Sequence, residues 1–544
     1  MSEMSSPSPS PLIVTGPPAD ADPSHGDGTA NAVSDVFTRQ LYFRGLGLVS
    51  LIAFLSLWSQ IHGLVGSEGL LPAERFFQRA YLQLGNAAYH KLPSVCWLGS
   101  NDILLHVWCG SGAALSALLM AGLTPRLVLL LLWGIYLSLT VAGQQLLSFQ
   151  WDTLLLEMYV CSLLYAPRGW FPDWKHPSRP LPAARWLVWL LAFKLMFLSG
   201  VTKLLSGDPS WHDGSALQYH YYTQPIPSWL SWYADQFPVT FHQATLVAMF
   251  TVEVIGPFLI FFGRRGRAIF GLATIALMAA IEATGNFGFF NLQTVVLCLP
   301  LIDDSTWQWL APTRVLQLFR RANSLTSDPT AKPVNERLRY LLGTGFATAV
   351  LAVSMLTLLR EMVRTQQPEK LPGPIAAVLR IADWSVVAWS EAWVLNPLAP
   401  FRSVNGYGLF RVMTTRRPEI IVEISDDGLN WKACEFRYKP GAVDRAPPIV
   451  APHMPRLDWQ MWFAALNPRG SEAWLAALTE RILEGNATTA RLLGQPELVN
   501  HPPRFVRLAY YEYKFSSGDQ RRVTGAWWSR SHLGDLMAPR SRRN

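Results

Sequence analysis

Long apolar runs, separated by short polar segments rich in arginine, fill the chain from about residue 40 to about residue 360. A helix needs about 17–25 apolar residues to cross the hydrocarbon core of a bilayer. Such runs fall at residues 42–61, 103–121, 127–143, 150–166, 186–204, 242–262, 267–284 and 338–359, with a shorter run at 289–302. The pattern predicts a polytopic α-helical membrane bundle of about nine spans within residues 35–365, in which the short run could be re-entrant.

From about residue 400 the pattern changes to short segments in which apolar and polar residues alternate. Such alternation is typical of strands with one buried face. The alternating segments are residues 418–425, 432–439 and 504–515, and the first two flank the turn sequence DDGLNW as in a β-hairpin. Residues 456–466 place their apolar side chains on one helix face, and a second helix is expected at 471–483. The sequence therefore predicts a small β-rich domain, α+β or β-sandwich-like, over residues 400–530.

The remaining segments are shorter and more polar. Residues 1–34 are rich in Ser, Pro, Gly and Asp and are expected to form a disordered tail. Two stretches between apolar runs, 62–102 and 205–241, are expected to be structured loops on the outer side of the membrane. Residues 366–399 contain three tryptophans and are expected to be a linker on the membrane surface, and residues 531–544 a basic tail.

Composition and charge support a membrane protein and suggest its orientation. Only 15% of the residues are charged, whereas soluble domains have about 25%. If the N-terminus is cytoplasmic, the inner segments contain sixteen Lys and Arg residues and the outer loops four, in accord with the positive-inside rule. This orientation places everything after residue 360 outside. The net charge of +8 is then a topology signal, and nucleic-acid binding is not expected.

Several ionisable residues fall inside the predicted spans, where an unpaired charge is costly. Asp152, Glu157, Lys194 and Glu253 are the candidates for acid–base chemistry if the protein is an enzyme, with His220 at the mouth of a pocket. The alternative is structural, with Lys194 pairing with Glu253 or Glu157 to hold helices together. Because Asp152 and Glu157 are five residues apart, they point in directions more than about 100° apart and need not share a site.

No metal or cofactor site is expected. The His and Asp residues between 212 and 242 match no metal-ligand spacing, and no nucleotide-binding or hydrolase motif stands in a suitable context. Arg456 and Asp458 are expected to pair with each other or to cap a helix. The five cysteines form no CxxC motif, and whether Cys96 and Cys434 form a disulfide is left open.

Seven sequence blocks occur in order over about residues 40–530. They are QIHGLVGSEGLLP (60–72), SFQWDTLLLE (148–157), KLMFLSGVTKLLSGDPSW (194–211), YHYYTQPIPSWLSWY (219–233), GNFGFFN (285–291), RRPEIIVEISDDGLNWKACEFRYKPG (416–441) and RLDWQMWFAAL (456–466). In this order the blocks resemble those of the lipase maturation factor family. The membrane part is also distantly similar to that of vitamin K-dependent carboxylase-like proteins.

The resemblance implies a membrane protein that helps exported proteins to fold, in particular secreted dimeric lipases, with the C-terminal domain contacting the client. Animal relatives are implied to reside in the endoplasmic reticulum. We interpret this chain as a bacterial member in the cytoplasmic membrane, with membrane lipid and exported clients as partners. The alternative is an integral-membrane enzyme acting on a lipid- or quinone-like substrate inside the bundle, and the folding-factor hypothesis is preferred to it.

The resemblance also marks individual positions, without assigning a catalytic role to any of them. In the membrane part, the matching residues that would line a pocket or contact a client are Gln150, Trp151, Lys203, Tyr219, Tyr221, Thr223, Gln224, Pro225, Trp232 and Tyr233. In the C-terminal part they are Arg417, Glu419, Glu423, Trp431, Glu435, Phe436, Arg456, Asp458, Trp459 and Trp462. Where the family often has the glutamate of YHYETQP, this chain has Tyr222, which counts against acid–base chemistry at that position.

Overall fold

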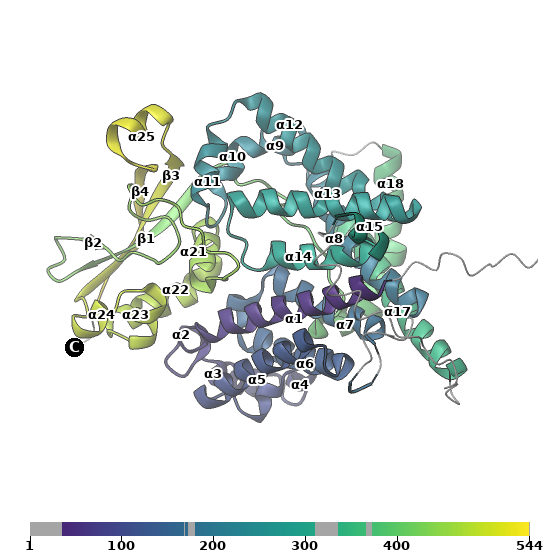
Figure 1. Cartoon of the computed structure of the whole chain (residues 1–544). Coiled ribbons are helices and arrows are strands. Elements are labelled where there is room, and N and C mark those ends of the chain that lie inside the picture. Colours follow the sequence, from purple (N-terminus) through teal and green to yellow (C-terminus); the bar gives the residue numbers. More distant parts are fainter. Residues whose placement is uncertain (1–34, 168, 172–179, 311–335, 366–372, 543–544) are drawn as a thin grey trace, which may run out of the picture.

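A helical bundle and a smaller domain that contains a β-sheet make up the described part of the molecule, and the sheet lies against one end of the bundle (Figure 1). The computed structural model describes residues 35–167, 169–171, 180–310, 336–365 and 373–542. The tail predicted at the N-terminus lies outside these residues.

Seven helices of the described part are long and apolar enough to cross a membrane. They are α1 (Val36–Trp58), α5 (Asp102–Ala121), α6 (Pro125–Ala142), α8 (Pro182–Leu205), the segment Val239–Phe261, α13 (Gly263–Thr284) and Tyr340–Thr365 of α17 (Glu336–Thr365). The segment Val239–Phe261 consists of α12 (Val239–Phe250), a π-helical turn (Thr251–Ile255) and a 3₁₀ turn (Gly256–Phe261). These helices confirm the prediction of a polytopic helical membrane part.

The two remaining apolar runs are also helical, but they are shorter. α7 (Gln150–Tyr165) has 16 residues, or about 24 Å, whereas the hydrocarbon core is about 30 Å thick. α14 (Phe290–Cys298) continues as a 3₁₀ turn to Leu301. Because α7 packs between α6, α8 and α14, most of its side chains contact protein rather than lipid. The count of nine spans stays a prediction.

Short helices occupy both segments that were expected to be outer loops. The first contains α2 (Ile61–Val65), α3 (Ala73–Leu84), α4 (Ala87–Lys91) and a 3₁₀ turn (Val95–Leu98). The second contains α9 (Pro209–His212), α10 (Ala216–Thr223) and α11 (Trp229–Asp235). The aromatic sequence 219–233 therefore belongs mainly to α10 and α11. Pro225 disfavours helical geometry at the residue before it, and α10 ends at Thr223.

A helical segment follows α17 and precedes the C-terminal domain. It comprises α18 (Gly373–Ala382), a π turn (Asp383–Val387), α19 (Ala388–Ser390), a second π turn (Glu391–Leu395) and α20 (Asn396–Leu398). Its tryptophans Trp384, Trp389 and Trp393 are 84%, 56% and 74% exposed. Arg364 near the end of α17 pairs with Glu391 at 2.6 Å and joins the segment to α17. Its position on the membrane surface stays a prediction.

Four antiparallel strands form the sheet of the C-terminal domain in the order β2-β1-β3-β4. They are β1 (Arg417–Ser425), β2 (Lys432–Ala433), β3 (Phe505–Phe515) and β4 (Trp528–Ser541). The helices of the domain are α21 (Arg456–Leu466), α22 (Pro468–Leu483), α23 (Ala487–Leu493), α24 (Glu497–Asn500) and α25 (Gly518–Thr524). A small sheet with the two predicted helices is confirmed in this region.

Two details of the predicted domain are wrong. The second strand of the hairpin is only two residues long, and in the part predicted to continue it the backbone N–H groups of Tyr438 and Lys439 donate to the Asp458 carboxylate. Residues 531–541, predicted as a basic tail, belong to β4 and pair with β3. Most side chains of β4 are exposed, as is common for a charged edge strand, so its sequence resembles that of a tail.

Strand β1 is covered on both faces, whereas the alternating pattern predicted one buried face. Ile420 and Val422 belong to the core that includes α21 and α22. Ile421, on the opposite face, clusters with Tyr513 and Trp528 and with residues of α10 and α11. The sheet therefore lies between its own helices and the 205–241 segment of the membrane part, which explains the buried position of its central strand.

We expect Trp528→Ala to destabilise the C-terminal domain. The indole is 2% exposed, and its centroid lies 4.4 Å from that of Phe515, so truncation leaves a large cavity that costs about 3–5 kcal/mol. The measurement is the thermal unfolding midpoint of the purified protein, together with protease resistance of the domain. Leu533→Ala, on an exposed position of the same strand, is the matched control and should leave both unchanged. An equal effect of the two substitutions would contradict the packing of β4.

Candidate functional site

Buried charges join α7 of the bundle to α21 of the C-terminal domain. Asp152 lies in the first turn of α7 and Arg456 is the first residue of α21, and the two are 0% and 1% exposed. The guanidinium donates to both carboxylate oxygens, at 2.5 and 2.8 Å, and the Tyr136 hydroxyl donates to one of them at 2.6 Å. The predicted pair of Arg456 with Asp458 is therefore wrong, since Arg456 pairs with Asp152 across the interface.

A second buried carboxylate lies farther along α7. Glu157 forms an ion pair with Lys194 of α8 and accepts hydrogen bonds from the Tyr407 hydroxyl at 2.7 Å and the Asn405 backbone N–H at 2.9 Å. Of the two partners considered for Lys194, the structure selects Glu157. Asp152 and Glu157 belong to separate clusters, as their angular offset on the helix predicted.

The third charged pair joins α8 to the π turn after α12. Lys203 donates to Glu253 at 2.5 Å, and its ammonium group lies 5.5 Å from the centre of the Trp211 ring. Both charged side chains are buried. The π turn places Glu253 on the face of its helix that contacts α8, where Gly200 allows close approach.

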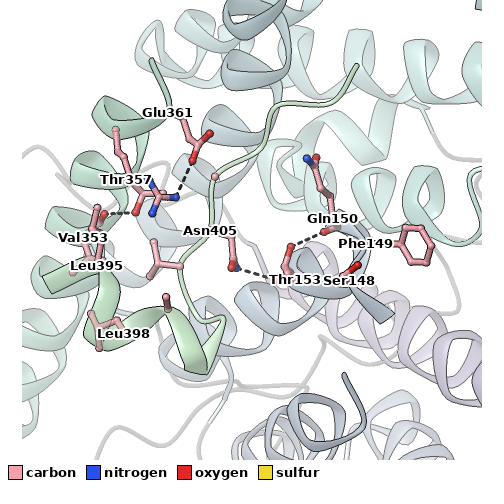
Figure 2. A pocket seen from close by; sticks show the side chains of 14 residues that line it. Ser148, Phe149, Gln150, Thr153, Val353, Thr357, Glu361, Leu395, Leu398 and Asn405 are labelled. Carbon is pink, nitrogen blue, oxygen red and sulfur yellow. Dashed lines mark hydrogen bonds and ion pairs between the residues drawn. The ribbon is translucent and has the colours of Figure 1, made fainter. Parts of the chain in front are cut away.

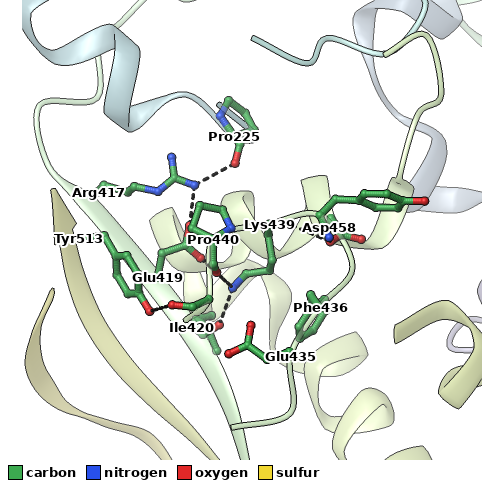
Figure 3. A network of polar contacts seen from close by, with 12 residues as sticks. Pro225, Arg417, Glu419, Ile420, Glu435, Phe436, Lys439, Pro440, Asp458 and Tyr513 are labelled. Atoms are coloured by element: carbon green, nitrogen blue, oxygen red, sulfur yellow. Dashed lines mark hydrogen bonds and ion pairs between the residues drawn. The ribbon is translucent and has the colours of Figure 1, made fainter. Parts of the chain in front are cut away.

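Arg417 of β1 binds the end of α10, as Figure 3 shows. Its guanidinium donates to backbone carbonyls of Tyr222, Gln224 and Pro225. It also donates to Glu419 at 2.6 Å, and Glu419 pairs with Lys439 at 3.0 Å. The last carbonyls of a helix have no partner within the helix and form its negative end, so a buried guanidinium is well suited to this position.

Tryptophans of the sequence blocks 219–233 and 456–466 complete the same interface. The indole N–H groups of Trp462 and Trp459 donate to the backbone carbonyls of Thr223 and Asn286, at 2.8 and 3.2 Å. The indole N–H of Trp232 donates to the carbonyl of Ser516 in the C-terminal domain at 3.0 Å. These bonds hold α10, α11 and the connection between α13 and α14 against α21 and the sheet.

Other marked residues lie within the C-terminal domain, away from the bundle. Glu423 pairs with Arg507 at 2.7 Å, and the Arg507 guanidinium lies 4.3 Å from the centre of the Trp431 ring. Glu435 lies 3.5 Å from Arg445. The Phe436 ring lies 5.2 Å from the Lys439 ammonium group. Asp458 accepts hydrogen bonds from two backbone N–H groups, and burial nevertheless raises the pKa of its carboxyl group.

Two cavities lie beside the beginning of α7. The smaller, of about 260 Å³, lies between α7, α17 and residues 404–406, and Figure 2 shows the Asn405 side chain in its wall donating a hydrogen bond to the Thr153 carbonyl at 3.2 Å. The larger, of about 1060 Å³, lies between the bundle and α21. Gln150 lines both, whereas Trp151, Lys203, His220, Tyr221, Pro225, Tyr233, Glu253, Trp459 and Trp462 line the larger one. Tyr219 is partly buried beside the core that α10 shares with the sheet.

The sequence reasoning missed several residues of the interface. Tyr136, Asn405 and Tyr407 provide hydrogen bonds to the two carboxylates of α7. The Asn286 side chain accepts from the backbone N–H groups of Val450 and Ala451 and donates to three carbonyls. Asn286 lies in the block GNFGFFN, so the block was found, but its glycine and asparagine indicated only a turn.

Within the described ranges, no three His, Cys, Asp or Glu side chains are grouped so as to hold a metal ion. The five cysteines are buried free thiols, and this answers the open question about Cys96 and Cys434.

Comparison with known proteins identifies the family. The model of the lipase maturation factor transmembrane domain matches residues 37–309, and that of the lipase maturation factor C-terminal domain matches residues 403–538. Lipase maturation factor 2 of Homo sapiens is 34% identical over 590 residues, covering 92% of this chain and 82% of the relative. The chain belongs to the lipase maturation factor family.

Other members of the lipase maturation factor family are similarly related. Lipase maturation factor 2 of Xenopus tropicalis is 34% identical over 585 residues, with 92% of this chain and 82% of the relative covered. Lipase maturation factor 1 of Bos taurus is 30% identical over 531 residues, with 93% and 89% covered. No solved structure matches the chain.

We expect Arg456→Met to destabilise this lipase maturation factor family member strongly. The substitution leaves the Asp152 carboxylate buried without its cation, a change that costs about 3–5 kcal/mol, and adding Asp152→Leu should recover part of the loss. The measurement is the thermal midpoint of each purified variant in detergent. The matched control is Arg522→Met, which removes an ion pair whose side chains are 80% and 87% exposed and should have no measurable effect. An unchanged midpoint for Arg456→Met would show that the pair does not hold the two parts together.

We also expect acid to destabilise the protein through His220. Burial, with a smaller effect of nearby Lys203, lowers the pKa of His220 to about 4, below the unfolded value of about 6.5. The folded state therefore favours the neutral ring, and stability is lost as the pH falls from about 6.5 to about 4, by about 3 kcal/mol. Thermal midpoints at pH 7.5 and pH 5 should differ less in His220→Asn than in the wild type. His90→Asn, on an exposed position of α4, should behave as the wild type.

Proposed function

We propose that this protein is a membrane-embedded maturation factor for exported lipases. The observation that carries the proposal is the similarity to proteins named lipase maturation factors over 92% or more of the chain, which includes both the membrane part and the C-terminal domain. Because both parts are matched, the proposal concerns the whole molecule rather than a fold shared with unrelated proteins.

The arrangement of charges supports a positioning role for the membrane part. Asp152, Glu157, Lys194 and Glu253, the residues considered for acid–base chemistry, each pair with a buried partner that joins two helices or two parts of the protein. The bundle would thereby hold the C-terminal domain in a fixed place, where its exposed surface meets a client as it folds.

We infer an orientation with the N-terminus in the cytoplasm and the C-terminal domain outside, in the endoplasmic reticulum lumen or the bacterial periplasm. The excess of basic residues in the inner segments supports it. The C-terminal domain contacts the end of α8 and the beginning of α7, which this orientation assigns to the outer side. The units would be a membrane domain at 35–365, a surface linker at 366–399 and an outer domain from 400.

Deletion of the gene in its native host should lower the specific activity of exported lipases. A maturation factor acts on the folding of its client, so we expect lipase polypeptide to be made but to be inactive or degraded. The measurement is lipase activity per amount of secreted lipase protein, with and without the plasmid-borne gene.

The client surface can be tested in the same strain. Val523→Asp and Leu429→Asp alter side chains that are 86% and 83% exposed on the outer domain, and Leu82→Asp alters one that is 83% exposed on α3. We expect the outer-domain pair to restore less lipase activity than the α3 control at equal protein levels. The proposed function would be overturned if deletion left the specific activity and the amount of exported lipases unchanged and altered the lipid or quinone composition of the membrane.

A further inference from the structure

The larger cavity lies where the membrane part meets the C-terminal domain. Its volume of about 1060 Å³ is at the upper end of the range of about 300–1,000 Å³ that is usual for small-molecule sites. Its walls come from the ends of α8, α12 and α13 that face the C-terminal domain, and α21 closes it with Trp459, Trp462 and Phe463. The lining residues of α13 extend from Leu277 to Thr284, which is about 10 Å along the helix.

The cavity borders apolar surface that α12 exposes. Phe237, two residues before α12, and Phe241 of α12 line the cavity and are 50% and 39% exposed. Val239 and Val247, on the same helix, are 49% and 65% exposed and belong to a segment apolar enough to cross a membrane. A hydrocarbon chain could thus enter the cavity from the bilayer while remaining in contact with apolar side chains.

The polar groups in the wall carry no net charge. Lys203 and Glu253 neutralise each other at 2.5 Å. Burial keeps His220 in its neutral form at pH 7, in which one ring nitrogen donates and the other accepts hydrogen bonds. Ser199 and Thr294 add hydroxyl groups to the lining. An uncharged head group that both donates and accepts hydrogen bonds suits this set.

We propose that the cavity binds an uncharged single-chain amphiphile from the membrane, with its hydrocarbon chain among the aromatic side chains and its hydroxyl or carbonyl groups near Lys203, Glu253 and His220. The proposal is independent of the role in lipase maturation. It assigns to the cavity a ligand and no reaction.

Two other occupants suit the cavity less well. An anionic head group needs an unpaired cation, and the ammonium group of Lys203 is already engaged by Glu253. A polypeptide segment would bring backbone N–H and C=O groups into a mostly apolar space, where each needs a hydrogen-bond partner. An acyl chain has no such groups.

The test uses the full-length protein in lipid nanodiscs and two photoactivatable probes that share one acyl chain with a diazirine. One probe is a monoacylglycerol and the other is the corresponding lysophosphatidate, which differs by its phosphate. Ala280→Phe combined with Ala283→Phe fills the cavity from α13, because both alanines line it and are exposed in it. The control is Ala279→Phe, at an exposed position of the same helix that is not part of the lining.

We expect the monoacylglycerol probe to label peptides from 237–245 and 277–284. Labelling should fall at least five-fold in the filled variant and stay unchanged in Ala279→Phe. Equal labelling of the filled variant and the control, or labelling confined to lipid-facing positions such as Val247, would overturn the proposal. Stronger labelling by lysophosphatidate than by monoacylglycerol in the wild type would overturn the proposal that the ligand has an uncharged head group.

A second variant tests the polar end of the cavity. Glu253→Gln leaves the Lys203 charge without its partner, so lysophosphatidate labelling should rise at least five-fold relative to monoacylglycerol labelling. In the double variant Lys203→Gln, Glu253→Gln the wall is neutral again, and the preference for monoacylglycerol should return. If the ratio of labelling by the two probes is the same in the wild type, the single variant and the double variant, the head group does not bind beside Lys203 and Glu253, and the proposal fails.

Discussion

The buried ion pair between Asp152 and Arg456 is the interaction on which the arrangement of the two parts depends. Either charge without the other would lower the stability of the folded protein, because Asp152 is buried in an apolar helix bundle and Arg456 is buried at the first residue of α21. Together, with the Tyr136 hydroxyl, they satisfy each other in bidentate geometry. One cluster of buried side chains contains residues of both parts, so the bundle and the C-terminal domain form one structural unit.

The same principle recurs along the interface. Arg417 is held by the free carbonyls at the end of α10, and Glu157 is held by the backbone and side chains of residues 405–407. In each case a charge from one part is satisfied by groups from the other. The 205–241 segment also covers one face of the sheet, so that β1 is buried on the face that its own domain leaves uncovered. Polar and apolar contacts thus specify one mutual orientation.

The helices could be predicted from the sequence because hydrophobic length and periodicity are local properties. The helical character of 150–166, the strand at 504–515 and the helix at 456–466 follow from such patterns. The partners of Asp152 and Arg456 could not, because the two residues are 304 positions apart and no local pattern links them. For the same reason, local patterns predict one solvent-exposed face for β1 and a basic tail in place of most of β4. Their environment is set by segments that lie far away in the sequence.

The separation of Asp152 from Arg456 has a consequence for biosynthesis. Translation at about 5–20 residues per second makes Arg456 roughly 15–60 s after Asp152, and during that interval α7 carries a carboxylate without its cation. A chain that stops before residue 456 never acquires the guanidinium, however well its helices insert. A late segment of the chain therefore completes the interior of an earlier one, and a product truncated before residue 456 retains an unpaired carboxylate in its helix bundle, by which a quality-control protease could distinguish it from the finished protein.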